Sequence, residues 1–208
     1  MTESPLEMDA ERMRRLGYRA VDALVERASG LPDDRPWVGG DRAELEPLLR
    51  EPPPEEGDDP EAVLERALRD VLHRAGRVDH PRFFAFVPSS PTWPSVLGDF
   101  LAAGANVFQG TWLESAGPSQ IELVVLDWFR EWVGFPEGAG GLLTSGGSAA
   151  NLCALVAARE AAAAPERPVV YTSDQGHSSL ERAARIVGVR PGDVRRLPTD
   201  DAFRMRPG

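Results

Sequence analysis

The segment TSGGSAAN, residues 144–151, places a glycine turn and hydroxyl side chains directly before a strongly helical run. Gly146 and Gly147 allow a sharp turn and a close approach of the backbone to a ligand. The unpaired N–H groups and the dipole at the start of a helix favour an anion, and Ser148 adds a hydroxyl donor. The segment therefore predicts either a phosphate-binding turn or an ordinary serine-capped helix start.

A second candidate is His177, which lies in SDQGHSS, residues 173–179, between a short β-branched run and a helix. In a parallel α/β sheet, ligands bind at the carboxyl ends of the strands, where both segments would lie. The imidazole could stack on a flat ligand or donate a proton, or it could serve only as a helix cap. A phosphate-binding turn and an imidazole at the same edge together indicate a phosphorylated planar cofactor.

Other chemistries fit these residues less well. A Walker loop needs a lysine, whereas all 23 basic residues are arginine. The run Gly146-Gly-Ser-Ala-Ala150 nearly matches the nucleophile elbow GxSxG, which would make Ser148 the nucleophile of a serine hydrolase with His177 as its base, but the last glycine is missing. The three histidines and the single cysteine show no metal-ligand spacing, so we expect no metal site.

The composition disfavours several classes of partner. A formal net charge of −10 over 208 residues disfavours nucleic acid, whose phosphates require clustered cations. No apolar run reaches the ~18–20 residues that a membrane span needs, and the charged N-terminus lacks the apolar core of a signal peptide. The single cysteine, Cys153, forms no disulfide within the chain. We expect it to be a small core residue of a cytoplasmic protein.

Apolar periodicity predicts the elements of the N-terminal third. It indicates an amphipathic helix over 7–29 that ends at Gly30, and a second helix that begins at Asp59-Pro60. Residues 30–59 are rich in Pro, Gly, Asp and Glu, which predicts an extended connector. Because two such helices bury little apolar surface, we expect this arm to pack on another domain or subunit.

The rest of the chain alternates helices with short strands. Helices are predicted over 117–135, 148–164 and 177–187, and strands over 168–172 and 194–197. This alternation indicates an α/β layer with parallel strands. The apolar face of the first helix is expected to be buried, and it consists of Ile121, Val124, Val125, Trp128, Phe129 and Trp132.

Several separate motifs resemble the group II pyridoxal-phosphate-dependent decarboxylases, and most of all the aromatic-L-amino-acid decarboxylases. HPRFFAFVPS, residues 80–89, looks like the HPxFxAYFP(T/S) segment of the family. TSGGSAAN is a common family form, and SDQGHSSLER, residues 173–182, is the most specific match. The end of the chain, LPTD followed by FRMR, resembles the IPxDxxFxMR run. The likeness covers nearly the whole chain.

The resemblance implies the α/β fold of type I pyridoxal-phosphate enzymes, a mostly parallel sheet flanked by helices, in an obligate homodimer. Residues 1–78 would form an N-terminal helical arm with its Pro-rich connector. Residues 79–208 would form the first part of the large cofactor-binding domain. The fold would be incomplete. In the family, the cofactor-binding lysine and the aspartate that pairs with the pyridinium nitrogen lie C-terminal to the region that this chain covers.

The resemblance also implies roles for individual residues. Gly147 and Ser148 would bind the phosphate of pyridoxal 5′-phosphate, and His177 would stack on the pyridine ring and position the substrate. Ser89 would approach the substrate carboxylate. The pocket for the substrate side chain would be lined by Phe86, Val87 and Pro88.

The activity implied is the decarboxylation of an L-amino acid to an amine and CO2, within amino-acid metabolism. An aromatic substrate is favoured by the segment HPRFFAFVP and by the pair of segments SDQGHSS and FRMR. The family often has Trp at the position of Val78, and Tyr-Phe where this chain has Phe86-Val87. Both departures lie at the substrate pocket.

The chain contains no lysine, so none of its side chains can form the family's covalent bond to the cofactor aldehyde. We therefore expect the chain to be inactive alone, as a truncated sequence, a fragmentary gene product or one half of a split enzyme. Two alternatives are a non-catalytic regulatory chain that keeps the arm and the dimer surface, and a serine hydrolase that uses Ser148.

Overall fold

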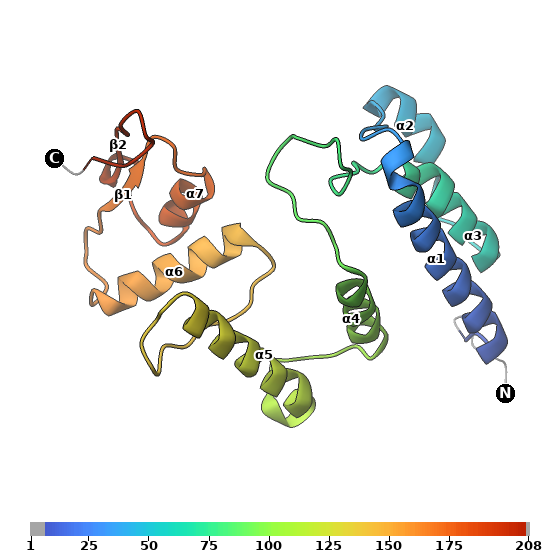
Figure 1. Cartoon of the computed structure of the whole chain (residues 1–208), viewed down its shortest axis with the longest axis horizontal. Helices are drawn as coiled ribbons and strands as arrows, with labels where there is room; N and C mark the ends of the chain where they lie inside the picture. The colour runs from blue at the N-terminus through green and yellow to red at the C-terminus, as the bar shows by residue number, and fades with distance from the viewer. Residues whose placement is uncertain (1–6, 207–208) are drawn as a thin grey trace. The chain divides into compact units, whose positions relative to one another are not determined.

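The computed structural model describes residues 7–206, and the chain divides into two compact units, Met1–Ala105 and Asn106–Gly208. The first unit contains the helices α1 to α4. The second contains α5 to α7 and the strands β1 and β2 (Figure 1). The glycine turn and His177 both belong to the second unit.

In the first unit, α1 (Ala10–Gly30) packs along α3 (Pro60–Arg66) (Figure 1). Asp9 caps α1 by accepting a hydrogen bond from the backbone N–H of Arg12 at 2.7 Å. Asp59 caps α3 in the same way, and Pro60 occupies the first helical position. The predicted end of the first helix at Gly30 and the predicted start of the second at Asp59-Pro60 are confirmed.

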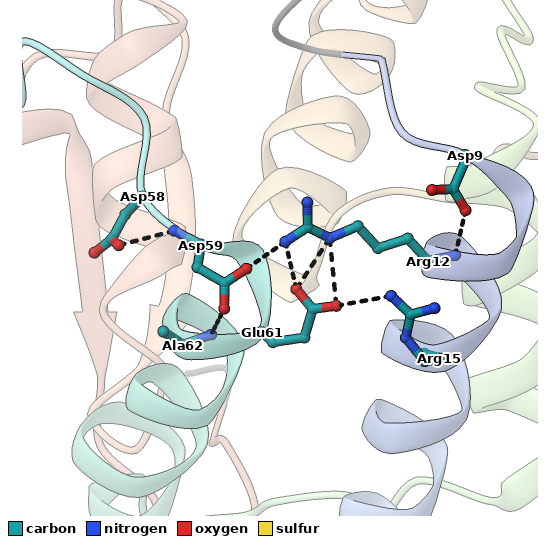
Figure 2. Close-up of polar contacts among 7 residues, drawn as sticks. All are labelled: Asp9, Arg12, Arg15, Asp58, Asp59, Glu61 and Ala62. Atoms are coloured by element: carbon teal, nitrogen blue, oxygen red, sulfur yellow. Dashed lines mark hydrogen bonds and ion pairs between the residues drawn. The ribbon is translucent and has the colours of Figure 1, made fainter.

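Ion pairs connect these two helices (Figure 2). Arg12 donates to Glu61 Oε2 from Nε at 3.0 Å and from Nη2 at 2.6 Å, and Nη2 also pairs with Asp59. Near the other end of α1, Arg27 donates two hydrogen bonds to Asp79, at 2.6 and 2.7 Å. The first unit is therefore held together by charged contacts as well as by apolar packing.

The extended connector is confirmed for residues 51–59, but the prediction was wrong for residues 42–49, which form α2 (Arg42–Leu49). Asp41 caps this helix by accepting from the backbone N–H of Glu44 at 2.8 Å. The run RAELEPLL consists mostly of good helix formers. A cap and two turns of favourable residues therefore outweighed the proline content of the surrounding segment.

Beyond α3 the chain continues through a π-helical turn, Ala67–Val71, and a 3-10 turn, Leu72–Arg74. A further helix, α4 (Trp93–Gly104), follows the irregular segment around residues 81–92. Thr92 and Ser95 form a capping box at its start, and a proline lies in its first turn. α4 was not predicted from the sequence, because the neighbouring prolines obscure its periodicity.

In the second unit, β1 (Val170–Ser173) and β2 (Val194–Leu197) pair in parallel. The helix α7 (Ser179–Ile186) connects them and packs against α6 (Gly147–Ala161), and α5 (Trp112–Trp132) precedes α6 (Figure 1). The backbone of α5 is kinked at Ser115. The predicted β–α–β unit with parallel strands is therefore confirmed, with boundaries shifted by one or two residues.

The buried apolar core of the described residues is small, and it consists of Leu31, Ala183, Ala184 and Val189. The accessible surface is 16432 Å², whereas a compact protein of this mass exposes about 9,500 Å² and two separate compact halves would expose about 11,500 Å². Apolar surface that is normally covered is therefore open to solvent. In the described part of the chain, no helix has the length and apolar character needed to cross a bilayer.

Two expectations about burial were wrong for this chain. Much of the apolar face of α5 is open to solvent, including Ile121, Trp128 and Trp132, which are 64%, 51% and 72% exposed. Cys153, expected in a core, is also exposed, on α6. These side chains lie on α5 and α6.

Candidate functional site

The glycine turn has the local geometry of an anion site. α6 begins at Gly147, and Gly146 precedes it with φ 155° and ψ 172°, a conformation that is almost restricted to glycine. The first helical hydrogen bond runs from the Ala150 N–H to the Gly146 carbonyl at 3.0 Å. No side chain caps this helix, so its first N–H groups remain available to a ligand.

Ser148 lies inside the first turn of α6 and is exposed. It does not cap the helix, so the ordinary serine-cap interpretation of this segment was wrong. An added Cβ at Gly146 or Gly147 would meet no atom within 4 Å. The space in front of the turn is therefore open to a ligand.

The turn that carries His177 is attached to the carboxyl ends of both strands. The Asp174 N–H donates to the carbonyl of Leu197, the last residue of β2, at 2.9 Å. The Asp174 side chain accepts from Thr199 Oγ1 at 3.0 Å. A side chain at Gly176 would overlap Thr172 Oγ1, so this close return of the backbone requires glycine. The predicted position of His177, at the edge where ligands bind in such sheets, is confirmed.

Hydrogen bonds join the helix of the glycine turn to His177. Asn151 Nδ2, one turn into α6, donates to Ser179 Oγ at 2.8 Å. Ser179 Oγ in turn lies 2.8 Å from His177 Nδ1, and the Ser179 N–H donates to the same nitrogen at 3.2 Å. The structure therefore brings the two predicted segments together through a side-chain contact.

Asn151 and Ser179 were not predicted as site residues, although both lie within the two motifs. Asn151 is four residues after Gly147, on the same helix face, and Ser179 is two residues after His177. Ser179 is 2% exposed, and His177 is exposed. Helical spacing from Gly147 was the one signal that could have identified Asn151.

Charged groups stabilise the frame around these residues. Arg196 of β2 pairs with Glu181 of α7, and this contact lowers the pKa of Glu181. Arg167 donates to Asp193, which is 2% exposed, at 2.9 Å and lowers the pKa of that carboxyl group. Both carboxylates are therefore ionised at neutral pH and anchor the strands to their surroundings.

No hydrogen bond links Ser148 to His177 within residues 7–206, and His177 Nδ1 is engaged by Ser179. A serine nucleophile requires that hydrogen bond to its base. No group of three or more metal-ligating side chains occurs in the part of the chain that the structure describes.

The segment 80–89 belongs to the first unit. His80 is 3% exposed, with Nε2 3.1 Å from the Asp34 carbonyl and Nδ1 accepting from the Arg82 N–H at 2.9 Å. Phe86 has a φ of 61°, which is strained for an aromatic residue. The four residues predicted to contact the substrate lie in an irregular part of this segment. All of them are exposed: Phe86, Val87, Pro88 and Ser89.

The structure therefore places the predicted site residues in two groups. Gly147, Ser148 and His177 lie together in the second unit, connected through α6, α7 and β1. The four residues of 86–89 lie in the first unit. The buried His80 holds the start of that segment in place.

Comparison with known proteins gives a consistent result. Residues 43–208 match the model of the pyridoxal-dependent decarboxylase conserved domain. An aromatic-L-amino-acid decarboxylase from Bacillus atrophaeus is 42% identical over 202 residues, covering 96% of this chain and 42% of that protein. A phenylacetaldehyde synthase from Arabidopsis thaliana is 30% identical over 214 residues, covering 96% of this chain and 44% of that protein.

The fold also matches solved structures. The crystal structure of Oryza sativa TDC with PLP and tryptamine superposes with a TM-score of 0.85 at 27% sequence identity. The match covers 97% of this chain and 44% of that one. The chain thus spans less than half the length of the relatives it matches.

Proposed function

Since the chain belongs to the pyridoxal-dependent decarboxylase family, we propose that it is part of an enzyme that converts an aromatic L-amino acid to its amine and CO2. The observation that carries this proposal is the contact between the uncapped start of α6 and the His177 turn, through Asn151 and Ser179. It links the start of α6, which would bind an anion, to the imidazole that follows β1, although no strand precedes the glycine turn within residues 7–206.

The residues present fit the phosphate end of pyridoxal 5′-phosphate. The N–H groups of Gly147 and Ser148 lie at the positive end of the α6 dipole, and the Ser148 hydroxyl is exposed beside them. The open space at Gly146 and Gly147 admits the phosphate oxygens. We assign phosphate binding to Gly147 and Ser148 on this basis.

We propose that His177 covers one face of the cofactor ring and positions the substrate carboxylate. The cofactor, when bound, supplies the sink for the electron pair released as CO2 leaves. Ser89 would contact the carboxylate, and its exposure leaves its hydroxyl free to do so. Phe86, Val87 and Pro88 would contact the aromatic side chain, as their exposed position allows.

We further propose that residues 1–78 act as the arm, and 79–208 as the first part of the cofactor-binding domain, of a homodimer. Support comes from the total accessible surface of 16432 Å², which exceeds that of two compact halves by about 5,000 Å², and from the large apolar side chains that lie exposed. That excess is larger than a standard protein–protein interface of about 1,600 Å². A cytoplasmic setting agrees with the free thiol of Cys153.

Because the chain lacks lysine, we propose that it binds the cofactor through the phosphate only and does not decarboxylate amino acids alone. The same fact supports a second candidate function, a non-catalytic chain that keeps the dimer surface. The two candidates differ in whether the chain supports product formation when the remainder of a family enzyme is supplied.

The test has two parts. Phosphorus NMR titration of pyridoxal 5′-phosphate with the purified chain should show saturable binding, and pyridoxal without phosphate should bind weakly. Chromatography with phenylalanine, tyrosine or tryptophan should then show amine when the C-terminal portion of the Bacillus atrophaeus relative is added, and none without it. Aldehyde as the product would instead match the synthase relative. Absence of phosphate-dependent binding would contradict the proposal.

A further inference from the structure

We propose that Asn151 and Ser179 are positioning residues that fix the tautomer and orientation of His177, so that Nε2 presents a proton to the ligand. This inference rests on the proposed function, because it concerns the group that the imidazole offers to the substrate. It adds to the site two residues to which no role in phosphate binding or in the substrate pocket has been assigned above.

The direction of the hydrogen bonds determines the tautomer. Asn151 Nδ2 donates to Ser179 Oγ, so the Ser179 hydroxyl proton is left to be donated onward. His177 Nδ1 lies 2.8 Å from that oxygen and also accepts from the Ser179 N–H at 3.2 Å. Because Nδ1 accepts both hydrogen bonds, the proton of the neutral ring must be on Nε2.

Burial shows where the constraint acts. Ser179 is 2% exposed and Asn151 is half-buried, whereas the His177 side chain is exposed. The inner nitrogen of the ring is therefore held in a protected contact, where water competes poorly for the hydrogen bonds. The outer nitrogen makes no hydrogen bond within residues 7–206.

Helix capping alone does not explain this arrangement. Capping of α7 would require only the bond from the Ser179 N–H to His177 Nδ1. The contact from Asn151 comes from a different helix and is directed at the serine hydroxyl, not at a backbone group. This contact directs the Ser179 hydroxyl proton towards the His177 ring, which the capping of α7 does not require.

The chemical consequence concerns the substrate. A ring nitrogen that carries a proton attracts a carboxylate oxygen, whereas the lone pair of the other tautomer would repel it. With Nδ1 committed to Ser179, His177 remains a donor to the substrate carboxylate even when the imidazole is neutral. The pair Asn151 and Ser179 thus keeps the proton of the neutral ring on the nitrogen that faces the substrate.

The test measures the tautomer directly. Long-range proton–nitrogen NMR of the full chain labelled with ¹⁵N-histidine reports which ring nitrogen is protonated, and H177Q assigns the signal. We expect the Nε2–H form for the unaltered chain. Ser179→Ala should lower the ratio of the Nε2–H to the Nδ1–H form about fivefold, the effect of one ordinary hydrogen bond. Ser179→Thr, which keeps the hydroxyl, should restore the ratio.

Two further variants complete the design. Ser178→Ala removes the adjacent hydroxyl, which makes no contact with the ring in the described structure, and should change nothing. Asn151→Leu should shift the tautomer ratio in the same direction as Ser179→Ala. It tests the positioning role if the Ser179→Ala variant does not fold. An Nδ1–H form in the unaltered chain, or an unchanged ratio in both variants, would overturn the proposal.

The readout needs no cofactor, so its failure can be told apart from failure of the proposed function. If the tautomer is fixed but pyridoxal 5′-phosphate does not bind, the positioning role is supported and the proposed ligand is contradicted. If the cofactor binds but the ratio is insensitive to both variants, the positioning role alone is refuted.

Discussion

At the scale of single residues, the chemistry of this chain lies in two short turns. The turn before α6 offers N–H groups and the Ser148 hydroxyl, and the turn after β1 offers the His177 ring. Neither turn carries a formal positive charge, because the residues 144–149 and 173–179 contain no arginine or lysine. Phosphate binding must therefore come from hydrogen bonds and the helix dipole.

This leads to a prediction for Ser148. Ser148→Ala should weaken binding of pyridoxal 5′-phosphate about tenfold, because the lost bond joins a hydroxyl to a charged oxygen. Isothermal titration calorimetry measures the change. Ser145→Ala is the matched control, since Ser145 is equally exposed but precedes the helix. Equal affinities for both variants would show that Ser148 does not contact the phosphate.

At the scale of elements, local signals were sufficient for the ends of α1 and α3 and for the β–α–β unit, whereas the capped helices α2 and α4 were not predicted. Asp59-Pro60 and Gly30 marked helix ends correctly, since caps act within one turn. The contact from Asn151 to Ser179 was not predictable, because it depends on how α6 and α7 pack. The motifs identified Gly147, Ser148 and His177, whereas the residues that orient His177 required the tertiary structure.

The pairing of α1 with α3 should depend on pH. Arg12 lowers the pKa of Glu61 from 4.5 to about 2, chiefly through its hydrogen bond. A carboxyl group whose pKa is lower in the folded state stabilises the fold above its ordinary pKa, and this contribution is lost as the pH falls from about 4.5 towards about 2. Thermal unfolding followed by circular dichroism should show this loss.

The matched variants isolate that carboxyl group. Glu61→Gln should reduce the loss of stability between pH 5 and pH 2, relative to the unaltered chain, because it removes the titrating group. Glu55→Gln replaces an exposed glutamate in the irregular connector and should leave the pH dependence unchanged. Identical pH profiles for Glu61→Gln and the unaltered chain would contradict the assigned role of the pair.

At the scale of the whole molecule, the main observation is the amount of exposed apolar surface. Large aromatic side chains of α5 lie open, and four apolar residues are buried among residues 7–206. Contiguous patches of this kind mark surfaces that other protein covers. The excess surface is consistent with a chain that matches less than half of its relatives' length.

We therefore expect the isolated chain to self-associate. Sedimentation velocity should show a weight-average mass that rises with concentration, and Trp132→Arg should reduce this rise because it puts a charge in the α5 face. Glu131→Gln, on the neighbouring position of the same turn, is the control and should not reduce it. A monomer at every concentration, with a sharp cooperative thermal transition, would refute this expectation.

The sequence by itself determined the family resemblance, the parallel β–α–β unit and the residues that fit a phosphate and a planar ring. These features depend on short-range chemistry: glycine at a turn, a helix start, and strand and helix periodicity. The tertiary structure decided that Asn151 and Ser179 hold His177 and that the α5 face is open. Burial and side-chain pairing depend on which elements pack together, and periodicity alone does not specify the partner of an apolar face.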